Sequence, residues 1–252
     1  MAGLARLAAR TRDATTMRTT ALAIFAKTPG LSPVKTRLAE RIGATAAETF
    51  HLRAAACVAE VAGSLMPDVV PYWAVAEHAA LAHTSWHGFP MLWQGEGELG
   101  PRMQHVYDEL QRRHGRVLLI GVDIPQVSAP LLHTALTALD QPDTPFALGP
   151  AHDGGFWLFG GRLPLPGWLW SMVRYSQSDT ATQFLARLQP LGAVALLACL
   201  HDVDRAEDLL HVQAALAALP QPTAQQCALR AWLANGCAGT SHCRLRSDSS
   251  RA

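Results

Sequence analysis

The sequence has almost no net charge and no apolar run near the roughly 20 residues that a membrane-spanning helix needs. Its 252 residues carry a formal charge of +1, whereas nucleic-acid-binding domains usually present a broad basic face. We therefore expect neither a transmembrane segment nor a nucleic-acid partner. With 49% hydrophobic and 16% charged residues, the composition is typical of a globular protein that buries a sizeable core.

Cysteine is scarce and scattered, and no two cysteines form a CxxC pair. The five are Cys57, Cys199, Cys227, Cys237 and Cys243. Such a set fits a reducing compartment, in which cysteine is mostly a small buried hydrophobe, so we expect a cytoplasmic protein. The last three, even with a neighbouring histidine, are spaced too widely for a structural zinc site.

The chain is expected to fold as one main domain with two extensions. Residues 1–16 are rich in Arg and Ala but lack the apolar core of a secretory signal. We expect them to be a disordered extension or to precede the true start at Met17. The main domain is then 17–220, and residues 221–252 are expected to form a helical appendage with a flexible polar tail.

Apolar runs and helical patterns alternate along most of the chain. This alternation predicts an α/β fold with a largely parallel sheet flanked by helices. Pro71 places the second strand at an edge or at a strand start. The expected strands are 20–26, 68–76, a short one before the glycine-rich loop at 94–98, 117–120, two across 145–160 and one after 193; the expected helices are 44–64, 99–113, 128–140, 178–192 and one that ends near 216.

The first strand runs into a basic loop. Residues 27–41 hold four cations and one acidic residue, a local charge of four minus one, or +3. A loop at the carboxyl end of a first strand is where open α/β sheets bind ligands, and Lys27, Lys35 and Arg37 can face one anion. A diphosphate suits them, although a solvated basic loop is the plain alternative. The spacing matches neither Walker A nor GxGxxG.

Two further strands run into aspartates. Asp123 follows the apolar run LLIG, where a carboxylate is costly to bury without a cation or hydrogen bonds. Asp202 and Asp204 follow another apolar run and share a face if the segment is extended. Either one of them is a possible second ligand, with Asp123, of Mg²⁺ or Mn²⁺. A turn or helix-capping role is the alternative for Asp123.

Two glycine-rich segments complete the candidate features. In GPAHDGGFWLFG, Gly154 and Gly155 permit a close approach of backbone to ligand, and Asp153 is either a base for an acceptor hydroxyl or a turn former. In QGEGELGPRM, a loop with Gly97 and Gly100 leads into a helix N-terminus, which is suited to hold an anion.

The segments FAKTPGLSPVKTRLA, QGEGELGPRM, LLIGVDIP, GPAHDGGFWLFG, RYSQSDT and HDVDRAEDL occur in this order. Together they resemble a bacterial glycosyltransferase-like family that has the GT-A, or nucleotide-diphospho-sugar transferase, fold. Some members of that family are assigned to arsenosugar biosynthesis. The resemblance spans about residues 21–210, and the combination is far more specific than any one segment.

By position, the resemblance implies a role for most candidate residues. It places the loop residues at the nucleotide and Asp123 and Asp204 at the metal, while Asp153 is the candidate catalytic base on the evidence of its own segment. The nucleotide set is Lys27, Gly30, Lys35, Thr36, Arg37, Gly97 and Gly100. Related nucleotidyltransferases have a motif closer to DxDTPEDL around the second aspartate, and the chain has Arg205 and Ala206 in place of Thr-Pro. An acidic residue is common where His152 stands, and RYSQ replaces a more usual W-S-T pattern.

The resemblance implies a metal-dependent glycosyltransferase. Its partners would be a nucleotide-sugar donor and a small-molecule acceptor, and its cofactor Mg²⁺ or Mn²⁺. One alternative is a nucleotidyltransferase that couples an NTP to a phosphorylated small molecule and releases pyrophosphate, because guanylyltransferases acting on phospholactate share the KTRLA-like opening and the fold. A nucleotide-binding regulator without turnover is the other.

Overall fold

A computed structural model describes residues 19–82 and 85–236. The expected N-terminal extension and the polar tail lie outside these residues. One sheet of seven strands, in the order β3-β2-β1-β4-β6-β5-β7, forms the centre of the molecule. The strands are β1 (Thr20–Ala26), β2 (Val69–Val75), β3 (Met91–Trp93), β4 (Arg116–Gly121), β5 (Phe146–Pro150), β6 (Phe156–Gly161) and β7 (Val194–Leu196).

The sheet is largely parallel, as the alternation of strands and helices predicts. Only β6 runs antiparallel to its neighbours, β4 and β5. β2 lies inside the sheet, yet β3 pairs only with its last three residues, Trp73–Val75. Pro71 therefore lies in a stretch of β2 that pairs with β1 on one side, which is compatible with a missing N–H donor.

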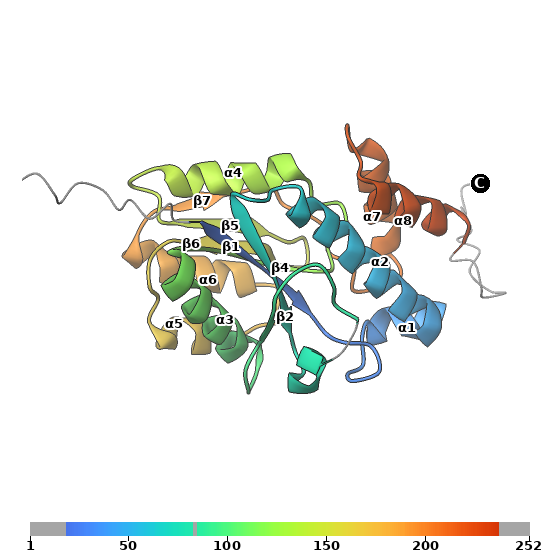
Figure 1. The fold of residues 1–252 in the computed structure, drawn as a ribbon, viewed down its shortest axis with the longest axis horizontal. Helices are drawn as coiled ribbons and strands as arrows, with labels where there is room; N and C mark the ends of the chain where they lie inside the picture. Colours follow the sequence, from blue (N-terminus) through green and yellow to red (C-terminus); the bar gives the residue numbers. More distant parts are fainter. Residues whose placement is uncertain (1–18, 83–84, 237–252) are drawn as a thin grey trace, which may run out of the picture.

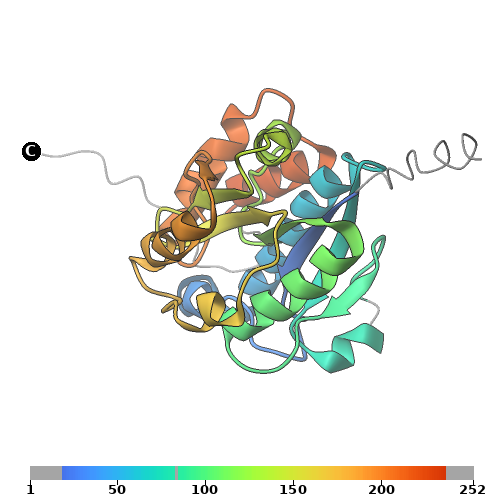
Figure 2. The ribbon, with the colours of Figure 1, turned by 90° about the vertical axis from the view of Figure 1, so that its left-hand side faces the viewer.

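Helices cover both faces of the sheet (Figures 1 and 2). α2 and α4 lie on one face, and α3, α5 and α6 lie on the other. The α-helices are α1 (Thr36–Ile42), α2 (Ala44–Gly63), α3 (Leu99–His114), α4 (Ala129–Asp140), α5 (Gly167–Ser171), α6 (Thr180–Leu188), α7 (Asp208–Ala218) and α8 (Ala224–Ala234); η1 (His78–Ala82) and η2 (Gln189–Leu191) are 3₁₀ turns. In the part of the chain described, no helix is both long and apolar enough to span a membrane.

The burial of both faces of β1 explains why this strand is apolar from Ala21 to Ala26. Leu22 and Ile24 pack in the core with α2 and α4, whereas Ala21 and Ala23 pack in the core with α3, α5 and α6. A strand buried on both faces has apolar side chains at successive positions. The parallel neighbours β1 and β4 end at the same edge, which brings together the loops that follow them.

α7 and α8 form a third core with α1 and α2. Leu229 and Leu233 of α8 are buried there against residues of α2 and α7. A capping box begins α8, in which the Thr223 hydroxyl accepts from Gln226 N–H and the Gln226 side chain accepts from Thr223 N–H. The segment expected as a helical appendage thus contributes a helix that packs on the domain.

Candidate nucleotide and metal site

A cleft of about 660 Å³ opens at the carboxyl edge of the sheet. The loops that follow β1 and β4, the turn between β5 and β6, the segment after α5 and the segment after β7 all line it. Its polar and charged lining residues are Lys27, Lys35, Thr36, Arg37, His51, Gln94, Asp123, Asp153, Tyr175, Ser176, Thr180, Asp202 and Asp204. The sequence therefore predicted seven residues that do meet in one cleft: Lys27, Lys35, Thr36, Arg37, Asp123, Asp153 and Asp204.

The basic loop after β1 is anchored at Thr28. Its N–H donates to the Glu77 carboxylate at 3.0 Å, and its hydroxyl accepts from the Trp86 indole at 2.9 Å. Its carbonyl accepts from the N–H groups of Leu31 and Ser32, which closes a turn that includes Gly30 at φ 84°. The loop thus has a defined path and leaves Lys27 exposed at the cleft.

Lys35 does not extend into open solvent. Its Nζ lies 2.7 Å from Asp123 Oδ2 and 3.8 Å from Asp204 Oδ1, and it donates to the Val203 carbonyl at 2.5 Å. Only 6% of the side chain is exposed. The backbone is left-handed at φ 49°, which is uncommon for a residue other than glycine, so the surrounding contacts hold it there.

Arg37, in the first turn of α1, contacts Asp204, one of the two carboxylates near Lys35. Its Nη1 donates to Asp204 Oδ2 at 2.9 Å, and both side chains are about half exposed. The turn that presents Asp204 is closed by Asp208, whose carboxylate accepts from the N–H groups of Asp204 and Arg205. This turn forms with Arg205 and Ala206 where related proteins have Thr-Pro.

The structure therefore pairs the predicted diphosphate ligands with the predicted metal ligands. Spacing along the chain shows that cations and carboxylates reach the same edge, but it does not show which contacts which. Here Lys35 and Arg37 neutralise Asp123 and Asp204.

Whether the site suits a metal ion can be judged from the oxygens that surround one cation. The carboxylates of Asp123 and Asp204 and the carbonyl of Val203 all face Lys35 Nζ. Such oxygens suit Mg²⁺ or Mn²⁺, which typically takes one or two carboxylates together with substrate phosphates. Among the described residues, no group of three or more His, Cys, Asp or Glu side chains has the geometry to hold a metal ion. The donor set fits an ion that phosphates complete, rather than an all-protein cage.

Asp202 lines the cleft without an ion-pair partner among the described residues. Burial first, and then the charges of Asp153, Asp123 and Asp204, raise the pKa of its carboxyl to about 6. Of the two aspartates that the sequence left open, Asp204 is therefore the one that shares the Lys35 ammonium with Asp123.

The opposite wall is the turn between β5 and β6. Asp153 Oδ1 accepts from the Gly155 N–H at 2.7 Å, so Asp153 is a turn former whose carboxylate also borders the cleft. Gly154 has φ 89°, and a Cβ there would overlap the backbone carbonyl of Ser178. The Gly154 carbonyl accepts from Ala181 N–H at 2.8 Å. This turn is therefore packed tightly against the start of α6.

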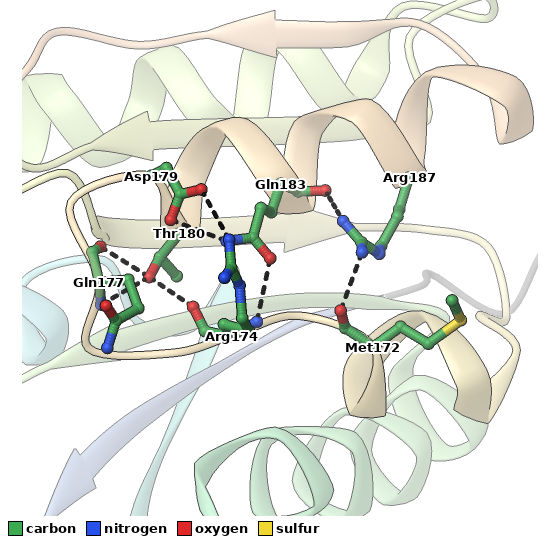
Figure 3. A network of polar contacts seen from close by, with 7 residues as sticks. All are labelled: Met172, Arg174, Gln177, Asp179, Thr180, Gln183 and Arg187. Carbon is green, nitrogen blue, oxygen red and sulfur yellow. Dashed lines mark hydrogen bonds and ion pairs between the residues drawn. The ribbon is translucent and has the colours of Figure 1, made fainter.

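The segment between α5 and α6 is held by the polar network of Figure 3. The buried Thr180 hydroxyl has the carbonyls of Arg174 and Gln177 as acceptors for its one proton, and it accepts from Gln177 N–H. Arg174 contacts Asp179, and Arg187 donates to the Met172 carbonyl. This network fixes Tyr175 and Ser176, which has φ 58°, at the wall of the cleft. The sequence pattern predicted no role for these residues.

The three predicted glycines lie elsewhere. Gly30, Gly97 and Gly100 are not among the described residues that line the cleft. A Cβ on Gly100 would come within 2.6 Å of the Trp170 carbonyl and 2.7 Å of the Tyr175 ring. Gly100 thus permits α3 to pack against α5, which explains a glycine there without a nucleotide.

Besides Thr180, two buried polar residues of the lining were not predicted from the sequence, His51 and Gln94. His51 of α2 donates through Nε2 to the Lys27 carbonyl at 2.8 Å, and its Nδ1 has no partner among the described residues. Burial lowers the pKa of His51, which keeps the imidazole neutral near pH 7. Gln94 donates to the Ala74 carbonyl at 2.8 Å. A polar residue within an otherwise apolar helix face, as at His51, was the available signal.

Residues 57–177 match the model of a family described as an uncharacterised protein conserved in bacteria, DUF2064. No curated protein sequence matches the chain. Among solved structures, a Desulfovibrio desulfuricans G20 protein described as a putative nucleotide-diphospho-sugar transferase has a TM-score of 0.75 and 24% identity over 85% of this chain and 95% of its own.

Two further solved structures have the same fold at lower similarity. The 4-diphosphocytidyl-2C-methyl-D-erythritol synthase of Anaerococcus prevotii DSM 20548 has a TM-score of 0.52 and 11% identity, over 80% of this chain and 99% of its own. A cytidylyltransferase of Leptospira borgpetersenii serovar Hardjo-bovis (strain JB197) has a TM-score of 0.50 and 13% identity, over 86% and 94%. The predicted α/β fold, with the architecture of a nucleotide-diphospho-sugar transferase, is confirmed.

Proposed function

We propose that the protein is a metal-dependent glycosyltransferase that moves a sugar from a nucleotide-diphospho-sugar to a small-molecule acceptor. The observation that carries the proposal is one cleft that combines basic residues, two converging carboxylates and a third carboxylate on the opposite wall. The likeness in fold to a protein described as a nucleotide-diphospho-sugar transferase supports it. Assignment to arsenosugar biosynthesis stays a prediction.

Each wall of the cleft has a role in this proposal. Lys27 and Arg37 bind the diphosphate, and Arg37 is able to do so through two N–H groups. Asp123 and Asp204 hold Mg²⁺ or Mn²⁺. When bound, such an ion stabilises the negative charge that develops on the departing nucleoside diphosphate. Asp153, on the acceptor wall, takes the proton of the acceptor hydroxyl.

A nucleotidyltransferase is the second candidate, because two of the solved structures with this fold are described as a cytidylyltransferase and a diphosphocytidyl-methylerythritol synthase. It would couple an NTP to a phosphorylated small molecule and release pyrophosphate. The same cations and carboxylates suit a triphosphate, so the residues of the cleft do not separate the two reactions.

Product analysis separates them. The purified chain is incubated with Mn²⁺ and each of a set of labelled nucleotide-sugars, and in parallel with NTPs and phosphorylated small molecules. Release of nucleoside diphosphate from a sugar donor supports the glycosyltransferase. Release of pyrophosphate from an NTP supports the nucleotidyltransferase. Binding of nucleotides without either product identifies a regulator and overturns both.

The cytoplasmic location is likewise a proposal. The described cysteines, Cys57, Cys199 and Cys227, are all free, and Cys57 is buried. Free thiols of this kind support a reducing compartment.

Replacing Arg37 tests the diphosphate contact. Because the Arg37–Asp204 pair is exposed, its loss should change stability by no more than about 1 kcal/mol. Loss of a charge-assisted bond to phosphate should weaken nucleoside diphosphate binding by roughly 1.5–3 kcal/mol. We expect this result for Arg37→Ala in calorimetry with Mn²⁺ present. Arg41→Ala, on the same helix but outside the cleft lining, is the control, and equal affinities of the two variants would contradict the assignment.

A further inference from the structure

Lys35 occupies the position at which the oxygens of the site converge. Lys35 Nζ donates a hydrogen bond to the Val203 carbonyl and pairs closely with Asp123, and Asp204 lies within ion-pair distance of it. The ammonium is therefore held by one backbone carbonyl and two carboxylates of the protein. Its side chain is 6% exposed, whereas those of Asp123 and Asp204 are 38% and 45% exposed and can be reached from the cleft.

A divalent ion bound by the same carboxylates would lie next to the Lys35 ammonium. The ion and the ammonium are both positive and would be close neighbours, and the ammonium is largely shielded from water, so they would repel each other strongly. The charges also balance already, because Lys35 and Arg37 offset Asp123 and Asp204. The free ion thus gains little at this site while Lys35 stays in place.

We propose that Lys35 and the divalent ion are alternative occupants of one position, so that the site takes the ion as its complex with a diphosphate. In that complex the diphosphate oxygens accept hydrogen bonds from Lys35 Nζ and Arg37. The carboxylates of Asp123 and Asp204, released by these cations, then bind the ion. This inference rests on the proposed function, and it adds that the ligand is the metal–diphosphate complex rather than the free metal.

The local structure permits this exchange. A lysine ammonium is a compact charge on a flexible four-carbon stem, so it can change partners without moving its helix. Lys35 precedes the first turn of α1, at the end of the loop that holds Lys27. Arg37, which is 55% exposed, can turn from Asp204 to the same phosphate.

The test measures binding of Mn²⁺ alone to the full chain, by electron paramagnetic resonance of the free ion. Lys35→Met removes the competing charge and keeps a stem of similar length. We expect it to bind Mn²⁺ at least tenfold more tightly than the parent chain. Lys27→Met is the matched control, because it removes one positive charge from the same cleft at a residue in no ion pair among those described. It should change the affinity less than threefold.

Equal Mn²⁺ affinities for Lys35→Met and Lys27→Met would overturn the proposal, since the effect would then be one of general charge. Lys35→Gln gives the same comparison if the methionine variant does not fold. In the double variant Lys35→Met/Asp123→Asn the gain should disappear. If the tight binding persists there, the ion lies elsewhere and the proposal is wrong.

A second measurement follows the diphosphate. Inorganic pyrophosphate, in saturating Mn²⁺, should bind Lys35→Met at least tenfold more weakly than the parent chain, and unchanged affinity would contradict the exchange. None of these measurements involves a sugar donor or turnover. Product analysis can therefore reject the glycosyltransferase activity while the binding data still show that Lys35 and Mn²⁺ compete. Conversely, the activity can be found while the binding data reject the competition.

Discussion

At the scale of single residues, the four aspartates of the cleft differ in what surrounds them. Asp123 and Asp204 share Lys35, and Asp153 accepts from the Gly155 N–H. Asp202 is partly buried near all three, without a cation of its own among the described residues. A carboxylate in this position destabilises the folded chain when it is ionised.

Replacing Asp202 should therefore stabilise the protein at neutral pH. The pKa of its carboxyl is raised to about 6 on folding, from 3.8. The folded chain thus holds a proton that the unfolded chain has lost between these values, and stability falls as pH rises through this window. Asp202→Asn should gain on the order of 1–2 kcal/mol at pH 7.5, after allowance for solvent screening. The gain should vanish near pH 3.5, where both states are protonated.

Urea unfolding of both chains at several pH values, with chelator present, measures this difference. Asp143→Asn, at an exposed turn, serves as the control and should show no such dependence. A gain of equal size at pH 3.5 and pH 7.5 would show that the change acts through packing and not through charge.

The residues of the site were largely predictable, and their pairing was not. An apolar strand that runs into Asp123, and another into Asp204, places both at one edge of a parallel sheet. That Lys35 contacts both depends on the left-handed turn at Lys35 and on the path of the loop before it, which come from long-range contacts such as Thr28 with Glu77. Periodicity carries no information about such contacts.

At the scale of elements, the cleft wall that holds Asp153 depends on a close approach between two segments. Gly154 has φ 89° and lies against the backbone of Ser178, and the network around Thr180 holds that backbone in place. A side chain at 154 cannot be accommodated by moving a flexible neighbour, because backbone is in the way. The turn and the start of α6 should therefore respond to substitution as one unit.

Gly154→Ala should destabilise the protein by about 3 kcal/mol or more, because overlap adds to the strain of a positive φ. Gly30→Ala is a matched control, since φ is 84° there but a Cβ would meet nothing within 4 Å. It should cost only the conformational strain of about 1–2 kcal/mol. Thermal unfolding of the two variants gives the comparison, and equal losses would show that the contact with Ser178 does not constrain the turn.

Long elements were predicted better than short ones. The strand at 20–26 and the helix from Ala44 have the bounds that their patterns indicated. α1 and α5 were not predicted, because they have seven and five residues and neither begins with a side-chain cap. β7 is shorter than the apolar run that contains it, since β5 pairs with only three of its residues. Tertiary contacts, rather than local pattern, decide such short elements.

At the scale of the whole molecule, α8 is joined to the loop that presents Asp123. Gln226 is 1% exposed, and its Nε2 donates to the carbonyls of Pro125 at 2.9 Å and Val127 at 2.7 Å. Its Oε1 accepts from Thr223 N–H. One amide from the far end of the sequence thus satisfies two backbone groups just after the candidate metal ligand.

Gln226→Leu should affect both stability and the site, although Gln226 is outside the cleft lining. Leucine has a similar volume but leaves the two carbonyls and the Thr223 N–H without their partner. Each buried group that loses its hydrogen bond costs about 1–3 kcal/mol, so the three groups together should cost about 3 kcal/mol or more in urea unfolding. The loop after β4 should also become less well placed, so that Asp123 binds Mn²⁺ with pyrophosphate more weakly. Gln225→Leu, exposed on the same helix, is the control for both measurements.

If Gln226→Leu loses stability but binds Mn²⁺ and pyrophosphate as Gln225→Leu does, α8 supports the fold without positioning the site. If neither changes, the contacts of Gln226 with the loop contribute nothing, and the third core alone holds α8 in place.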